Sequence, residues 1–221
     1  MVARTAKPGD VGPVARGTVS IEPAAAGRGL GRASPTTRGL ILALLMCGGT
    51  SAAAAQASAD SLLAPIFQNH AVLQRDAPIR LYGHADAGAS LQIRLAAHRL
   101  KVESDARGEW RAELPALPAG GPHVLEVQSG SRVQRIEDVL VGEVWLCSGQ
   151  SNMVLPVRRS LDADSEIAQA QNERIRLLTV PESASIEPSR GFARPLAWRL
   201  TRPDTVGEFS AKCYYFAREL Q

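Results

Sequence analysis

Residues 138–153 read DVLVGEVWLCSGQSNM, and this stretch decides the fold of the second half of the chain. Its apolar residues run on without alternating with polar ones. That pattern predicts a strand covered on both faces, as in an α/β sheet. The small residues SGQSN at 148–152 allow a tight turn beyond the carboxyl end of this strand. Open α/β sheets place their reacting groups at such an end.

Ser151 is the candidate functional residue of this turn. A serine there can project into a cleft while its backbone N–H points toward a substrate oxyanion. A helix N-cap is the alternative role, because serine and asparagine are favoured at that position. The local pattern alone does not separate the two roles.

Residues 62–140 show a different pattern, in which apolar and polar residues alternate. Alternation with one apolar face predicts half-buried antiparallel strands, and the turn residues between them favour a β-sandwich over 62–140. Trp110 is predicted to lie in its core, and the histidines at surface or edge positions. No histidine has a second ligand at metal-binding spacing, so no metal and no cofactor are predicted. The predicted strands cover residues 79–83, 91–95, 109–114 and 123–127, and the histidines are His70, His84, His98 and His123.

Residues 161–221 predict a helix, a strand and a further helix. The first helix covers 162–171, with Leu161, Ile167 and Ala170 toward the sheet, and the strand covers 175–180. From Val206 onward, apolar residues recur at helical spacing. This apolar face consists of Phe209, Cys213, Phe216, Ala217 and Leu220.

Cys147 and Cys213 lie in apolar stretches, which favours two free, buried thiols. In an exported protein they could instead form a disulfide.

The N-terminal segment carries most of the positive charge. Residues 1–38 hold six basic and two acidic side chains, which gives +4, so the remaining residues hold −1 of the net charge of +3. The body therefore lacks the basic character that nucleic-acid binding needs. Arg38, the apolar run at 39–47 and Ala55-Gln56-Ala57 predict a signal peptide over 38–59.

Cleavage is expected near Ala57 to Ala59, which predicts a periplasmic or secreted protein. The apolar run is too short for a permanent membrane span, which needs about 20 residues. Residues 1–37 are rich in glycine, alanine, proline and arginine and have no periodicity. We expect them to be a disordered extension or the product of a misassigned start codon.

GEVWLCSGQSNM, at 142–153, closely resembles the first conserved block of the sialate O-acetylesterase family, carbohydrate esterases of the SGNH hydrolase type. The resemblance extends to residues 62–88, residues 172–182, Trp198 and residues 207–221. It implies that Ser151 is the nucleophile, that its backbone N–H forms part of the oxyanion hole, and that Gly149, Gln150 and Asn152 complete the nucleophile loop. The implied substrate is an O-acetylated carbohydrate.

The implied fold is a β-sandwich at 62–140 followed, at 141–221, by the start of a three-layer α/β domain that is SGNH hydrolase-like and flavodoxin-like but truncated. The family activates its serine with a histidine near the C-terminus, yet no histidine follows His123. We therefore expect an inactive N-terminal fragment of an exported esterase. The apolar side chains expected to meet water are Val144, Leu146, Leu178 and Phe216.

Other charged residues near the turn are expected to be structural. Asp162, Asp164 and Glu166 fit the solvated face and the first turn of a helix. Arg158 and Arg159 are predicted to be surface charges, although they could steer an acidic sugar. The alternative function for the whole chain is a non-enzymatic carbohydrate-binding or structural module with a vestigial esterase segment.

Overall fold

The computed structural model describes residues 2–4 and 61–221, except 188, 190 and 193. The predicted signal peptide at 38–59 lies outside the described residues, as does the predicted extension apart from residues 2–4. In the described part, no helix has both the length and the apolar character needed to cross a membrane.

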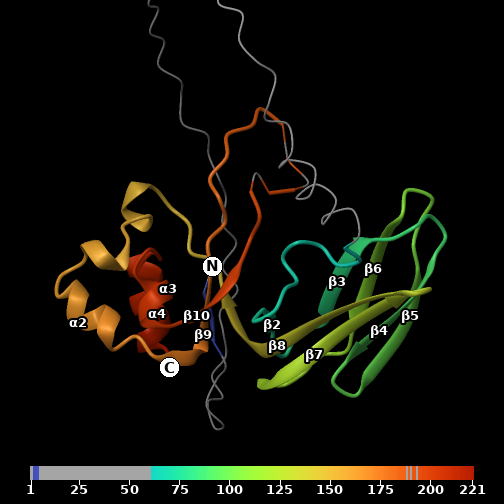
Figure 1. The fold of residues 1–221 in the computed structure, drawn as a ribbon, viewed down its shortest axis with the longest axis horizontal. Helices are drawn as coiled ribbons and strands as arrows, with labels where there is room; N and C mark the ends of the chain where they lie inside the picture. The colour runs from blue at the N-terminus through green and yellow to red at the C-terminus, as the bar shows by residue number, and fades with distance from the viewer. Residues whose placement is uncertain (1, 5–60, 188, 190, 193) are drawn as a thin grey trace, which may run out of the picture.

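Two β-sheets hold the described strands (Figure 1). The larger sheet has the order β10-β9-β1-β8-β7-β4-β5, with β2 paired to β8 outside this path, and the smaller sheet is β3-β6. The strands are β1 (Val2–Arg4), β2 (Val72–Gln74), β3 (Ile79–His84), β4 (Ser90–Leu95), β5 (His98–Glu103), β6 (Glu109–Leu114), β7 (Gly120–Ser129), β8 (Arg132–Trp145), β9 (Asn172–Leu178) and β10 (Trp198–Thr201).

The first hydrophobic core lies between the β3-β6 pair and the β4-β7 part of the large sheet. Side chains along β4 alternate between exposed and buried, as the period-two pattern predicts. Trp110 of β6 is buried in this core and donates its indole N–H to the carbonyl oxygen of Leu62 at 2.8 Å. The core position predicted for Trp110 is therefore confirmed, and all four predicted strands lie within β3, β4, β6 and β7.

Strand β8 joins this core to the second half of the chain. It pairs antiparallel with β7 and β1 and parallel with β2. It also runs without interruption across residue 141, where the predicted sandwich and esterase domains meet. The division of the chain into those two domains therefore stays a prediction. Residues 2–4, in the predicted N-terminal extension, form β1 between β8 and β9. The sequence analysis predicted no strand there.

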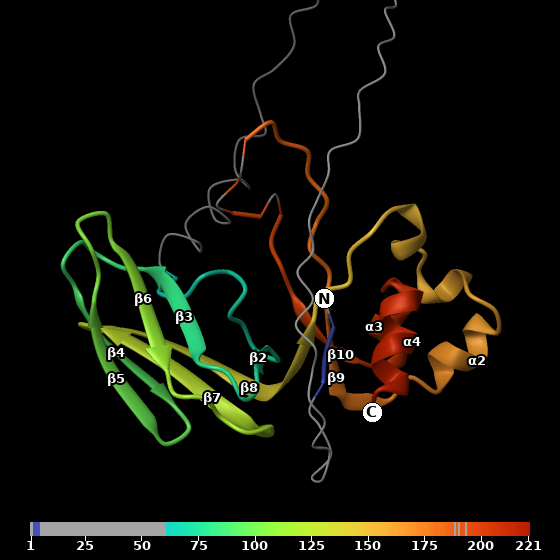
Figure 2. The same cartoon turned by 180° about the vertical axis from the view of Figure 1, so that it is seen from behind.

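The helices gather at the β9-β10 end of the large sheet, opposite the β3-β6 pair (Figures 1 and 2). They are α2 (Ala163–Ala168), α3 (Pro203–Val206) and α4 (Ala211–Glu219), with short 3-10 helices η1 (Ser151–Met153) and η2 (Val157–Arg159) before them. The second core packs these helices on β9 through Val157, Ile175, Leu177, Val206, Phe209, Cys213 and Tyr214.

Several predicted details of this half are wrong. The helix predicted at 162–171 is shorter, and Leu161, predicted to face the sheet, is 86% exposed because it precedes the helix in a turn. The helix predicted from Val206 is interrupted, since Ser210 caps a new helix by accepting a hydrogen bond from the backbone N–H of Cys213. In α4, Tyr214 is buried, whereas Phe216 is 42% exposed.

The prediction of exposed apolar residues holds only in part. Leu146 is 73% exposed and Phe216 is 42% exposed, whereas Val144 is partly buried. Leu178 is fully buried, because Leu196 and Trp198 cover it in a third small core. Trp198 belongs to β10, a strand that the sequence analysis did not predict.

A charged cluster ties β8 to β9 and to the segment before β2. Asp138 of β8 accepts two hydrogen bonds from the guanidinium of Arg176, at 2.5 and 3.0 Å, and its Oδ2 lies 2.6 Å from Nδ1 of His70. The side chain of Arg176 is only 3% exposed. Burial alone would raise the pKa of Asp138, but the hydrogen bonds from Arg176 and His70 outweigh it, so this pKa is lowered below 3.8.

We predict that Asp138→Asn destabilises the fold by about 1–3 kcal/mol at neutral pH, because it leaves the buried Arg176 guanidinium without its counter-charge. A carboxyl whose folded-state pKa is lowered contributes stability above its unfolded-state pKa of 3.8, and loses it as the pH falls through the lower folded-state value. The difference between the two proteins in urea unfolding should therefore shrink below about pH 4. Asp164→Asn, at an exposed position, is the control. Equal stability of the Asp138→Asn variant and the parent at pH 7 would contradict the prediction.

Candidate active site

The candidate site is the turn between β8 and η1. Ser151 is the first residue of η1 and is exposed. The residue at the N-cap is Gln150, whose backbone is extended, and no side chain caps this helix. The alternative role of Ser151 as a helix N-cap is therefore wrong. Its hydroxyl makes no hydrogen bond to another described residue.

A disulfide anchors the turn on its N-terminal side. Cys147, two residues after β8, is bonded to Cys213 of α4, with the two Cα atoms 6.0 Å apart. The preference for two free thiols is therefore wrong. An apolar stretch of sequence around a cysteine is expected both for a buried thiol and for a buried disulfide. Only the proximity of Cys147 to Cys213 in the folded chain distinguishes the disulfide from two free thiols.

Backbone hydrogen bonds anchor the turn on its C-terminal side. The N–H of Val157 donates to the carbonyl oxygen of Phe209 at 3.0 Å, and the N–H of Ala211 donates to that of Leu155 at 2.8 Å. Pro156 and Ser210 form an isolated bridge between these two bonds. The segment before α4 thus holds the chain just after η1, and the disulfide holds it just before. Sequence reasoning missed this pairing, because no local pattern marks it.

Steric crowding within the turn explains why residue 149 is a glycine. A Cβ atom at this position would lie 2.7 Å from Cγ of Met153, closer than two carbon atoms can approach without a shift. Gln150 and Asn152 are both exposed on the same turn. The structure thus brings together the four residues that the sequence places in the nucleophile loop, and their catalytic roles stay predictions.

The surroundings of the turn are apolar rather than charged. Val154 and Leu155 are exposed after Ser151, and Trp145 packs edge-on against Phe216 of α4, with ring centroids 5.2 Å apart. Exposed apolar side chains therefore follow Ser151 in the chain.

No described acid or histidine contacts Ser151. Glu166 forms an ion pair with Arg218 of α4, while Asp162 and Asp164 are exposed. Arg158 lies at the surface, where its Nε is 2.5 Å from Oε1 of Glu208.

The four histidines all have other surroundings. His70 belongs to the Asp138 cluster on β8. The other histidines belong to the first core region: His84 bonds the carbonyl oxygen of Arg107, and His98 and His123 lie on β5 and β7.

Comparisons with known proteins agree on one group of enzymes. No protein-family model matches this chain. The sialate O-acetylesterases of Pongo abelii and Homo sapiens are each 30% identical to it over 203 residues, which cover 82% of this chain and 37% of the relative. The chain therefore spans little more than a third of the length of these curated relatives.

A solved structure gives the same result. The carbohydrate acetylesterase from Xanthomonas citri has a TM-score of 0.70 and 38% identity, over 72% of this chain and 36% of that protein. This likeness supports an SGNH-like α/β fold. The separate β-sandwich that we predict at 62–140 stays a prediction.

We predict that Cys213→Ala lowers the free energy of unfolding of the helical half by about 2–4 kcal/mol, because the disulfide closes a long loop, with a sequence separation of 66. Dithiothreitol should destabilise the parent by a similar amount. The double variant Cys147→Ala/Cys213→Ala should not respond to it. Lys212→Ala, an exposed neighbour on α4, is the control. A non-reducing peptide map without a peptide that joins Cys147 to Cys213 would refute the prediction.

Proposed function

This chain belongs to the sialate O-acetylesterase family, and we propose that it supplies Ser151 as the nucleophile of an enzyme that hydrolyses acetyl esters of carbohydrates. The observation that carries the proposal is the state of Ser151. Its side chain is exposed and makes no hydrogen bond to a described residue, at a turn that is fixed on both sides to α4 or to the segment just before it. A residue that served only the fold would be expected to use its hydroxyl in a cap or a turn.

The proposed reaction is acyl transfer in two steps. The Ser151 hydroxyl gives its proton to a base and attacks the acetyl carbonyl carbon, and the tetrahedral intermediate then expels the sugar hydroxyl. Water releases acetate from the acetyl-enzyme in the second step. The backbone N–H of Ser151 donates to no other described residue, which supports its use as an oxyanion-hole donor. Gly149, Gln150 and Asn152 shape this turn.

The base that takes the proton from Ser151 is not among the described residues that are hydrogen-bonded to it. A serine hydroxyl is a weak nucleophile at neutral pH without an adjacent base, and no described histidine or carboxylate contacts Ser151. We propose that the base is a histidine outside these 221 residues. The 221-residue chain by itself is then expected to turn over acetyl esters at most very slowly.

Export is the second part of the proposal. The signal-like segment at 38–59 predicts a periplasmic or secreted protein. The Cys147–Cys213 disulfide supports it, because disulfides persist in oxidising compartments and are rare in the cytosol.

The nucleophile is tested in a longer version of the protein that includes the proposed histidine. Ser151→Ala should lower kcat for an aryl acetate by at least about a thousandfold, since removal of a serine nucleophile costs many orders of magnitude. Ser148→Ala removes a second exposed hydroxyl three residues earlier and should leave kcat within about threefold, because it touches no reacting atom. Activity of Ser151→Ala within tenfold of the parent would sink the assignment.

Export is tested by N-terminal sequencing of the protein collected outside the cytoplasm. The mature chain should begin near Ser58 or Asp60, because the small residues at 55–57 fit a signal-peptidase site. Recovery of the uncleaved chain from the cytoplasm alone would show that residues 38–59 are not a signal peptide.

A further inference from the structure

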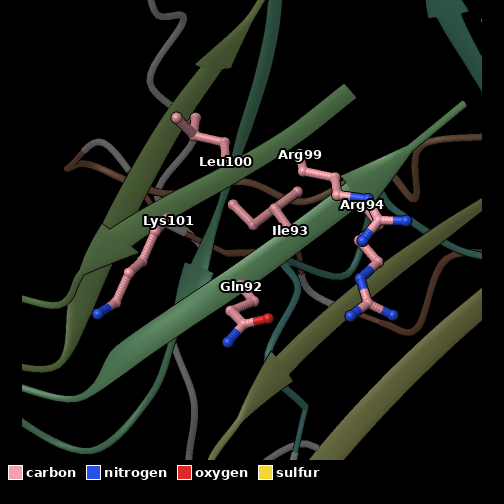
Figure 3. Close-up of a pocket in the computed structure, with 6 residues that line it drawn as sticks. All are labelled: Gln92, Ile93, Arg94, Arg99, Leu100 and Lys101. Carbon is pink, nitrogen blue, oxygen red and sulfur yellow. The ribbon is translucent and has the colours of Figure 1, made fainter. Parts of the chain in front are cut away.

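The outer face of the β4-β5 hairpin carries an unusual set of side chains. In the antiparallel register, Arg94 lies opposite Arg99 and Gln92 lies opposite Lys101. All four are exposed. Figure 3 shows the two arginine side chains next to each other, with Gln92 and Lys101 on the neighbouring part of the hairpin. Together these four residues are the basic face.

The basic face is electrostatically unfavourable for the protein alone. Like charges directly opposite on paired strands destabilise a sheet. Glu126 of β7 compensates one of them, since it lies 3.2 Å from Arg94. Within the described residues, Arg99 and Lys101 have no carboxylate partner. Glu103 lies on the same side of β5 as Arg99 and Lys101, with no ion pair to either among the described residues. Three basic and two acidic side chains therefore leave this face with a charge of +1, on a body whose summed charge is slightly negative.

Protection of a sheet edge explains only part of this arrangement. β5 is the edge strand of the large sheet, and a single lysine is often enough to discourage pairing with another chain. That need would be met by Lys101 alone and does not require an arginine opposite Arg94. A local arrangement that costs stability without a compensating contact is characteristic of functional sites.

We propose that the basic face binds a carboxylated carbohydrate chain, and the choice of a carbohydrate rests on the proposed function. The residues line a hollow of about 240 Å³. The planar guanidinium of Arg99 matches a carboxylate in a bidentate arrangement, and the Lys101 ammonium adds a point charge. The Gln92 amide can both donate to and accept from sugar hydroxyls.

This site is separate from the Ser151 turn. The β4-β5 hairpin lies at one end of the large sheet, whereas η1 and α4 lie with the helices near the other end (Figures 1 and 2). The basic face therefore anchors a carbohydrate chain without touching the acetyl group that is cleaved.

The test measures binding of the full chain to polygalacturonate, which bears a carboxylate on each sugar, by affinity electrophoresis. Its methyl-esterified form, with the same backbone but no charge, is the matched ligand control. We expect binding to the charged polymer alone, weakened by added salt. Arg99→Gln/Lys101→Gln should weaken it at least about tenfold, because each substitution removes a charge that meets the carboxylates.

Arg111→Gln/Lys212→Gln removes the same net charge from exposed positions outside the basic face and should change binding less than about twofold. Thermal melting shows whether each variant is folded. Unchanged binding in the basic-face variant, equal binding of the neutral polymer, or equally tight binding of duplex DNA would each overturn the proposal. Ser151→Ala should bind like the parent, so failure of the esterase assignment and failure of the basic face are distinguishable.

Discussion

The backbone pairing of β8 with three other strands is the constraint on which the rest of the structure depends. This fourteen-residue strand pairs with β7 in the first core, with β2 along its middle and with β1 toward its end. Side chains alternate over residues 132–137 of β8, so a slip of one residue there would exchange its buried and exposed faces. Asp138 ties β8 to β9 and to the segment before β2 through Arg176 and His70. Whatever fixes β8 therefore also fixes the position of the turn that follows it.

That turn combines the exposed hydroxyl of Ser151 with a rigid support. The disulfide precedes Ser151 and the bonds to the segment before α4 follow it, so a short stretch of chain is left to present the hydroxyl. Binding and catalytic groups work best when elements of regular structure hold their loop.

The sequence predicts this structure well where a feature follows from neighbouring residues. It predicts poorly those features that depend on contacts between residues far apart in the chain. Period-two alternation revealed four strands, but β5 was missed, because its residues are only half-buried and mostly polar. The turn at Ser151 followed from the apolar run and the small residues after it. The pairing of Cys147 with Cys213 and the burial of Leu178 could not be predicted, since each depends on segments that meet only in the folded chain. The basic face likewise arises from strand register.

The two proposals place carbohydrate chemistry at both ends of the large sheet, with the proposed nucleophile near one end and the basic face at the other. Peptide mass spectrometry tests most directly whether Ser151 is the nucleophile. A longer version of the protein, one that includes the proposed histidine, reacts with an acetylated carbohydrate and is then quenched in acid. An acetyl group should appear on Ser151 and disappear as acetate is released. Formation of acetate with no acetylated Ser151, or with the acetyl group on another residue, would contradict the assignment of Ser151 as the nucleophile.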